Sequence, residues 1–166
     1  MSERTWPLDW DLRMRGEACP MCESERADET PHGIRFFCGT WSDAYLGRQG
    51  PGRGYAYVIW RGRHVAEPTD LTAPEATGYW QEVLHAARAI ERHFEPCKMN
   101  YQLLGNSVPH LHTHLIPRYL DDVAPGRPLP GDTWAEGETH PIPEVRLRED
   151  VEALRRIEGD QIRPAG

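Results

Sequence analysis

The sequence predicts an α+β fold in a single domain spanning residues 1–166. We expect an antiparallel sheet of about five strands, with one long helix packed on it and a short C-terminal helix. Two patterns predict this class: short runs rich in β-branched and aromatic residues, and between them one segment with a helical hydrophobic period. The expected core covers residues 19–119, and an irregular extension follows at residues 120–166.

The first part of the chain predicts loops followed by a hairpin. Residues 1–33 are polar and broken by prolines, so we expect loops and turns there. Residues 34–38 and 42–46 have strand character, and a glycine-dense turn at residues 47–54 precedes a strand at residues 55–60. This turn is not a phosphate loop, because no Lys-Ser or Lys-Thr follows it and the next element is a strand.

The long helix begins at a capping box formed by Thr72 and Glu75 and ends before Pro96. Its apolar residues fall on one stripe, which we expect to face the core. The stripe consists of Ala76, Trp80, Val83, Leu84, Ala87, Ile90 and Phe94. For His85 and His93 on the same helix we expect surface or packing roles.

Two strands are predicted at residues 98–104 and 108–117. The turn residues 105–107 between them predict an antiparallel pair. The chain is then irregular until a short helix, marked by Leu147, Val151, Leu154 and Ile157. This tail carries Trp134, and we expect it to close over the site or to pack on a second subunit.

The formal net charge of −7 argues against a broad basic surface, so we expect neither nucleic acid nor a membrane as a partner. Residues 1–16 contain charges of both signs and no apolar signal core. No stretch approaches the roughly 20 apolar residues of a membrane span. These features predict a cytoplasmic protein.

The four cysteines are unevenly spaced, which in a reducing compartment favours a metal site or packing over disulfides. Cys19 and Cys22 have the spacing that wraps a tetrahedral zinc ion, although one such pair is weak evidence. Cys38 and Cys97 are expected to be packing residues.

The strongest chemical signal is the run His-Leu-His-Thr-His at residues 110–114. Side chains alternate along a strand, so His110, His112 and His114 are expected on one face. The outer two would lie about 13 Å apart at the backbone, which disfavours a site where all three bind one ion. A half-polar surface strand is the alternative, but three histidines in period two favour a functional site.

Residues 100–119 resemble the signature of the histidine triad (HIT) superfamily, a His-x-His-x-His run followed by apolar residues. The resemblance implies a HIT-like fold and nucleotide chemistry. It implies that His112 attacks the α-phosphorus and forms a covalent nucleotidyl-histidine. Neutral imidazole is a good nucleophile near pH 7, and its phosphoramidate is reactive enough to be turned over.

The resemblance also implies roles for neighbouring residues. His114 would touch the phosphate oxygens and, with a pKa near the ordinary value of about 6.5, protonate the leaving group. Asn106 and Ser107 would hydrogen-bond the phosphate and the leaving group, and we expect Ser107 to be catalytic as well. Asn100 would contact the phosphate or support such a contact. Turn chemistry explains Asn106 and Ser107 equally well.

A zinc-containing branch of the superfamily is similar in this respect to galactose-1-phosphate uridylyltransferases, and it completes a cysteine pair with two histidines. The matching positions here are His64, after the hairpin strand, and His110. The resemblance therefore implies a structural zinc ion held by Cys19, Cys22, His64 and His110. A redox dithiol, two buried cysteines and a vestigial site are the alternatives.

The chain departs from the family at residues 46–49, where many members carry an Asn or Asp for the ribose hydroxyls. Arg48 or Arg53 could contact extra phosphates there, although turn arginines are more often solvated. Family members are commonly two-fold dimers joined through the long helix and the sheet edge, so we expect a homodimer.

The expected function is hydrolysis of nucleotide phosphoesters or phosphoramidates, including dinucleoside polyphosphates. A nucleotidyltransferase or phosphorylase would form the same intermediate, but the transferase branch has glutamine at the third triad position, where this chain has His114. A nucleotide-binding regulatory module with little turnover is another alternative. A metal-dependent hydrolase is the last, and the scarcity of carboxylates near the triad counts against it.

Overall fold

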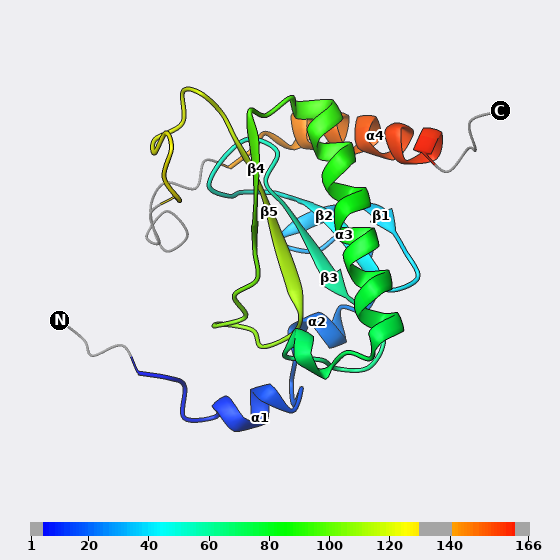
Figure 1. The fold of residues 1–166 in the computed structure, drawn as a ribbon, viewed down its shortest axis with the longest axis vertical. Coiled ribbons are helices and arrows are strands. Elements are labelled where there is room, and N and C mark those ends of the chain that lie inside the picture. Colours follow the sequence, from blue (N-terminus) through cyan, green and yellow to red (C-terminus); the bar gives the residue numbers. More distant parts are fainter. Residues whose placement is uncertain (1–4, 130–140, 162–166) are drawn as a thin grey trace.

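The computed structural model describes residues 5–129 and 141–161, which form a five-stranded antiparallel sheet with helices packed on it (Figure 1). In chain order the elements are α1 (Trp10–Met14), α2 (Pro20–Glu23), β1 (Gly33–Cys38), β2 (Ser42–Gly47), β3 (Ala56–Trp60), the 3-10 turn η1 (Pro68–Asp70), α3 (Ala73–Phe94), β4 (Lys98–Gln102), β5 (His112–Arg118) and α4 (Glu144–Gln161). The strand order is β1-β2-β3-β5-β4, and all neighbouring strands are antiparallel. The α+β prediction is confirmed.

Residues 1–33, where the sequence predicts mostly loops and turns, also contain the two short helices α1 and α2. Each is at most five residues long, so neither is long enough to show a hydrophobic period in the sequence. Helix α2 is a single turn that starts at Pro20, directly after Cys19. Proline suits this first position because its ring presets the helical φ.

Helix α3 begins and ends where the sequence predicts. Both hydrogen bonds of the Thr72–Glu75 capping box are present, and Glu95 ends the helix in the left-handed conformation, with φ of 50°. The buried stripe, however, is rotated from the predicted one, because Tyr79 is fully buried while Trp80 and Leu84 are exposed. The Tyr79 hydroxyl hydrogen-bonds Thr113 of β5 at 2.8 Å, so docking on the sheet selects this face.

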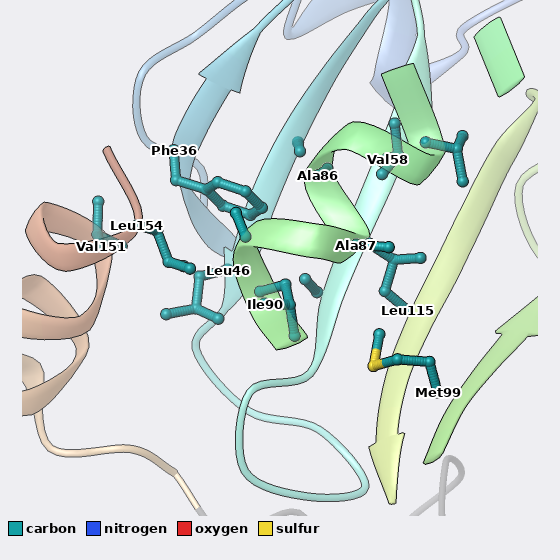
Figure 2. Close-up of a cluster of buried hydrophobic side chains, with 14 of the residues drawn as sticks. Phe36, Leu46, Val58, Ala86, Ala87, Ile90, Met99, Leu115, Val151 and Leu154 are labelled. Atoms are coloured by element: carbon teal, nitrogen blue, oxygen red, sulfur yellow. The ribbon is translucent and has the colours of Figure 1, made fainter. Parts of the chain in front are cut away.

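Helix α4 corrects two expectations about the C-terminal tail. It is 18 residues long, and it packs on α3 and β1 of its own sheet rather than over the histidines. Leu147, Val151 and Leu154 are buried in the main core. Figure 2 shows Val151 and Leu154 beside side chains of α3 and the strands. Trp134 lies outside the described residues. His93 contacts Asp150 of α4 at 2.8 Å and His85 contacts Glu158, which agrees with packing roles for both histidines.

Strand β5 begins at His112, four residues later than predicted. Residues 103–111 form a nine-residue connection from β4 in place of a tight turn. Pro109 has no N–H for a strand ladder, and Leu111 uses its N–H on the Val65 carbonyl at 2.7 Å. His110 therefore leaves the sheet before the strand starts.

The two faces of the sheet differ in character. One face carries the main core under α3 and α4. The opposite face carries a smaller buried cluster of Tyr45, Tyr57 and Ile59, against which Met21 packs. In the described part of the chain no helix is both long enough and apolar enough to cross a membrane.

Candidate active site and metal centre

A cavity of about 490 Å³ opens on the face of the sheet opposite α3 and contains two of the three histidines. Its walls come from the strands β3 and β5, from α2 and from three loops. The lining residues are Pro20, Met21, Ser24, Thr30, Pro31, His32, Gln49, Gly50, Pro51, Tyr55, Tyr57, Ile59, Val108, His112 and His114. We call this space the histidine cavity.

His112 and His114 lie side by side on β5, as strand alternation predicts. They pair with Ile59 and Tyr57 of β3, and their ring centres are 4.8 Å apart. The intervening Thr113 points to the other face and is fully buried against Tyr79. Two imidazoles therefore share one wall of the cavity.

The hydrogen bond of His112 identifies its reactive nitrogen. Nδ1 of His112 lies 2.6 Å from the carbonyl oxygen of His110. A carbonyl oxygen can only accept, so Nδ1 carries the proton and Nε2 keeps its lone pair. Burial lowers the pKa of His112, which favours the neutral ring. This is the protonation state that a nucleophilic imidazole requires.

The environment of His114 corrects the expectation of an ordinary imidazole acid. Burial, with a smaller contribution from His112, lowers the pKa of His114 to about 3. The ring is therefore neutral at pH 7, with one N–H that can donate a hydrogen bond. Its Nδ1 lies 2.8 Å from the hydroxyl of Tyr55, and the two rings are stacked.

His110 lies off the strand and faces a cluster of metal-ligand type. The donor atoms of this cluster all lie within 4.8 Å of one another. Its four residues are Cys19, Cys22, His64 and His110, the set that the resemblance implies. Nδ1 of His110 lies 3.5 Å from Sγ of Cys19 and 3.4 Å from Sγ of Cys22, and Nδ1 of His64 lies 3.5 Å from Sγ of Cys22.

The cluster fits a tetrahedral ion in both geometry and protonation. Zinc bonds of about 2.3 Å to sulfur and 2.0 Å to nitrogen give tetrahedral S···N edges of about 3.5 Å. Nε2 of His110 donates to the Trp60 carbonyl at 2.8 Å, and Nε2 of His64 donates to the Met14 carbonyl at 3.1 Å. Both rings therefore direct an Nδ1 lone pair at the sulfurs, as oriented metal ligands do.

Burial also suits the cluster to a cation. It lowers the pKa of His110 to about 4, so this ring is neutral and can bind a metal. It raises the pKa of Cys22 to about 11, with the neighbouring Cys19 adding to the shift. A buried thiol pair of this kind becomes a thiolate pair only when a positive charge compensates it.

Packing connects the cluster to the histidine cavity. Pro20 and Met21, between the two cysteines, form part of the cavity wall. Arg61 donates to the Met21 carbonyl at 2.8 Å and to the buried carboxylate of Asp43 at 2.8 Å. Breaking a buried ion pair of this type is costly, so Asp43 holds the Arg61 guanidinium in place, and the guanidinium in turn anchors the Met21 carbonyl of the cysteine loop.

Gly16 lets the N-terminal segment approach His64. It has φ of +81°, and a Cβ atom there would lie 2.5 Å from Cγ of His64. Glycine is the residue that meets both demands without strain. The sequence analysis attached no role to this glycine.

The remaining predicted site residues lie at some distance from the two histidines of the cavity. Asn106 and Ser107 are exposed in the connection before β5, next to Val108, which lines the cavity. Asn100 is on β4, where its Oδ1 accepts a hydrogen bond from Arg118 at 2.9 Å. It lines a different space at the edge of the sheet, of about 650 Å³.

The two turn arginines have structural partners. Arg48 forms ion pairs with Glu29 and Glu144. Arg53 donates to the Phe94 carbonyl at 3.0 Å and lies over the Tyr119 ring. Both side chains thus attach the glycine-dense turn to neighbouring segments. These partners argue against the predicted contact of Arg48 or Arg53 with extra phosphates.

Sequence reasoning missed three polar residues near the triad. Tyr55 and Tyr57 line the histidine cavity from β3 and the turn before it. Gln102 pairs with His114 across β4 and β5, and its Oε1 is buried without a hydrogen bond to any described residue. An aromatic residue directly after a glycine-dense turn was the only available signal for Tyr55.

Comparisons with known proteins agree with this architecture. Residues 48–121 match the family model of the HIT domain. The chain is similar to bis(5'-adenosyl)-triphosphatase from Saccharomyces cerevisiae, with 34% identity over 71 residues. That match covers 40% of this chain but only 34% of the yeast protein, so the two share about a third of the relative's length.

Two solved structures show the same fold. A histidine triad protein from Marinobacter aquaeolei superposes with a TM-score of 0.67 and 23% identity, over 87% of this chain and 98% of that one. A zinc-bound histidine triad family protein from Mycobacterium smegmatis superposes with a TM-score of 0.62 and 21% identity, over 87% and 95% of the two chains.

Proposed function

The chain belongs to the histidine triad superfamily, and from this premise we propose that it hydrolyses nucleotide phosphoesters or phosphoramidates through a covalent nucleotidyl-histidine on His112. One observation carries the proposal. The bond from Nδ1 of His112 to the His110 carbonyl leaves Nε2 with its lone pair, on a residue that lines the histidine cavity beside His114.

In the first step the Nε2 lone pair of His112 attacks the α-phosphorus and an N–P bond forms. The bond from phosphorus to the leaving group breaks, and its electron pair departs with the leaving oxygen or nitrogen. The N–H of neutral His114 donates to the phosphate and leaving-group atoms that gain charge, which stabilises the transition state. An anionic substrate next to His114 also raises the pKa of that ring, which brings proton transfer to the leaving group within reach.

In the second step water attacks the same phosphorus. The N–P bond breaks, its electron pair returns to Nε2 of His112, and one water proton passes to solvent. The product is a nucleoside monophosphate, and His112 is regenerated. No separate base is needed to activate the nucleophile, because burial already holds His112 neutral.

The similarity to the yeast bis(5'-adenosyl)-triphosphatase supports a dinucleoside polyphosphate as the first substrate to test. The residues that line the cavity support a substrate that contains a nucleoside. Tyr55, Tyr57, Ile59 and Met21 give the histidine cavity a largely apolar and aromatic wall, which suits a planar base. In this proposal Asn106 and Ser107 contact the phosphate or leaving group when substrate binds, while Asn100 acts indirectly through Arg118.

A structural zinc ion held by Cys19, Cys22, His64 and His110 is part of the proposal. Four converging donors with suitable protonation support it, as does the zinc-bound relative from Mycobacterium smegmatis. With four protein ligands the ion would have no open position for substrate. Its contribution would be to hold the cysteine loop and His110 in place, and the chemistry would be left to His112.

The proposal also includes a homodimer in a reducing compartment such as the cytoplasm. In the described residues β4 is an edge strand without a partner on its outer side. Trp80 and Leu84 expose apolar surface one turn apart on α3, and Tyr101 does the same on β4. A second copy of the chain would cover such an edge and patch.

Intact-protein mass spectrometry after mixing with diadenosine triphosphate or adenosine phosphoramidate tests the mechanism. Wild type should gain the mass of one adenylyl group and release AMP. The variant His112→Gln should do neither. The matched variant His93→Gln, on the helix behind the sheet, should still form the adduct because it keeps the nucleophile.

Two outcomes would overturn the proposal. An adduct on His112→Gln would place the nucleophile elsewhere. Nucleotide binding by wild type without an adduct or turnover would favour the binding-module reading.

A further inference from the structure

The phenol of Tyr55 makes a contact with the triad that the proposed mechanism leaves unexplained. Its hydroxyl oxygen lies 2.8 Å from Nδ1 of His114. The two rings are nearly parallel, with an interplanar angle of 20° and centres 6.0 Å apart. A hydrogen bond and a ring stack together define both the distance and the orientation of the His114 ring.

The glycine-dense turn makes room for this phenol. A Cβ atom on Gly47 would lie 2.6 Å from the Tyr55 ring, and one on Gly50 would lie 2.2 Å from it. Both distances are too short for any side chain with a Cβ atom. The backbone N–H of Gly47 also donates to the Tyr55 carbonyl at 2.9 Å. The turn therefore packs closely around Tyr55, and the Tyr57 ring contacts it with ring centres 6.2 Å apart.

Chemistry decides the direction of the Tyr55–His114 bond. Burial raises the pKa of Tyr55 above its ordinary value, so the phenol keeps its proton. A phenol O–H is a strong donor and an imidazole nitrogen is a strong acceptor, whereas a phenol oxygen accepts weakly. The favoured arrangement therefore has the Tyr55 O–H donating to Nδ1, which leaves the His114 proton on Nε2.

We propose that Tyr55, clasped by Gly47 and Gly50, is a positioning residue that holds His114 as the Nε2–H tautomer and directs this N–H at the leaving group. The inference rests on the proposed function, since it explains how His114 comes to donate to the departing atom. The phenol itself exchanges no proton with substrate. The cost of losing its hydroxyl should therefore depend on how much negative charge the leaving group develops.

The variant Tyr55→Phe keeps the ring and removes only the hydroxyl. With a basic leaving group such as an aliphatic amine or alcohol, kcat should fall about tenfold, a fraction of the 10²–10³ that a whole oxyanion donor supplies. With 4-nitrophenolate as the leaving group, kcat should fall less than about twofold. A purely structural role would lower both rates equally.

The glycines provide a second variant pair that retains the hydroxyl. In Gly50→Ala the new Cβ would collide with the Tyr55 ring and displace it, so we expect the same dependence on the leaving group as in Tyr55→Phe. Gly52→Ala in the same turn is the matched control, because a Cβ there meets no atom within 4 Å. It should behave as wild type with both leaving groups.

The tautomer is measured by ¹⁵N NMR of histidine-labelled protein without substrate. Wild type should show His114 with an unprotonated Nδ1 and a protonated Nε2, and the Nδ1 resonance should shift in Tyr55→Phe as the phenol bond is lost. A protonated Nδ1 in wild type, or equal rate losses with both leaving groups, would overturn the inference. Adduct formation on His112 is scored separately, so a failure of the proposed chemistry can be told apart from a failure of the Tyr55 role.

Discussion

Nδ1 of His112 donates to the backbone carbonyl of His110 at 2.6 Å, so the nucleophile candidate is oriented by a residue of the metal-type cluster. The ring of His110 is itself held by its Nε2 bond to Trp60 and by the two cysteine sulfurs. Any displacement of the His110 backbone therefore reaches His112 through one hydrogen bond. The proposed metal site and the proposed nucleophile are thus connected through His110.

Loss of the metal site should cost stability. We expect Cys22→Ser to abolish the binding of one zinc ion per chain and to lower the Tm by about 10 °C, which corresponds to about 3 kcal/mol for a chain of this size. Metal analysis and thermal unfolding measure the two effects. The exposed Cys38 supplies the control, since Cys38→Ser should keep both the zinc and the Tm. Equal zinc content in Cys22→Ser and wild type would argue against this ligand set.

The pH profile of kcat/KM should extend to low pH. Burial lowers the pKa of His112 below its ordinary value of 6.5, so a larger fraction of the ring is neutral and nucleophilic at pH 6.5 and below than for an unperturbed imidazole. An unperturbed imidazole would lose about tenfold in kcat/KM between pH 7.5 and 5.5. We expect a clearly smaller loss with diadenosine triphosphate, whose phosphates do not titrate in that range. A tenfold fall would show that the free enzyme carries an ordinary histidine.

Helix α4 should be essential for stability although it lies outside the segment that matches the family model. Leu154 is fully buried in the main core, so Leu154→Ala should lower the free energy of unfolding by about 2–5 kcal/mol. Urea unfolding measures the change. Val145→Ala on the same helix is the control, because Val145 is 72% exposed and should change stability by less than about 0.5 kcal/mol. Similar losses in the two variants would mean that α4 does not dock as described.

The exposed stripe on α3 should carry the dimer contact. Leu84 is 42% exposed and lies one turn from Trp80, which is 39% exposed. We expect light scattering to give twice the chain mass for wild type and a single chain mass for Leu84→Glu, because a buried unpaired carboxylate opposes association. Val145→Glu, on α4, should remain dimeric. A monomeric wild type at micromolar concentration would refute the predicted assembly.

Much of the fold was open to prediction because its signals are local. The strands at residues 34–38 and 42–46, the Thr72 capping box and the antiparallel pairing of the last two strands all follow from patterns a few residues long. The predicted start of β5, at residue 108, was wrong by four residues. There the backbone of Leu111 bonds to Val65, a partner that lies 46 positions earlier in the sequence.

The candidate site divides in the same way. The period-two histidines, taken alone, predicted that His110, His112 and His114 would share one face, which is right for His112 and His114 and wrong for His110, because β5 begins only at His112. The resemblance supplied the metal quartet. Neither the histidine pattern nor the resemblance could predict the proposed role of Tyr55, because its contact with His114 joins residues 59 positions apart. The lowered pKa of His114 could not be predicted from the sequence either, since it results from burial in the folded protein, which no local pattern encodes.

The sequence by itself thus determined the class of fold, because periodicity and residue type are properties of the chain, and its resemblance to the histidine triad superfamily supplied the nucleophile candidate and the four residues of the metal-type cluster. Only the tertiary structure decided which nitrogen of His110 and of His112 carries the proton, which face of α3 is buried, and that α4 completes the core. The physical reason is that proton positions and burial depend on partners brought together by packing, and Cys19 and His110, which are 91 positions apart, meet only in the folded chain.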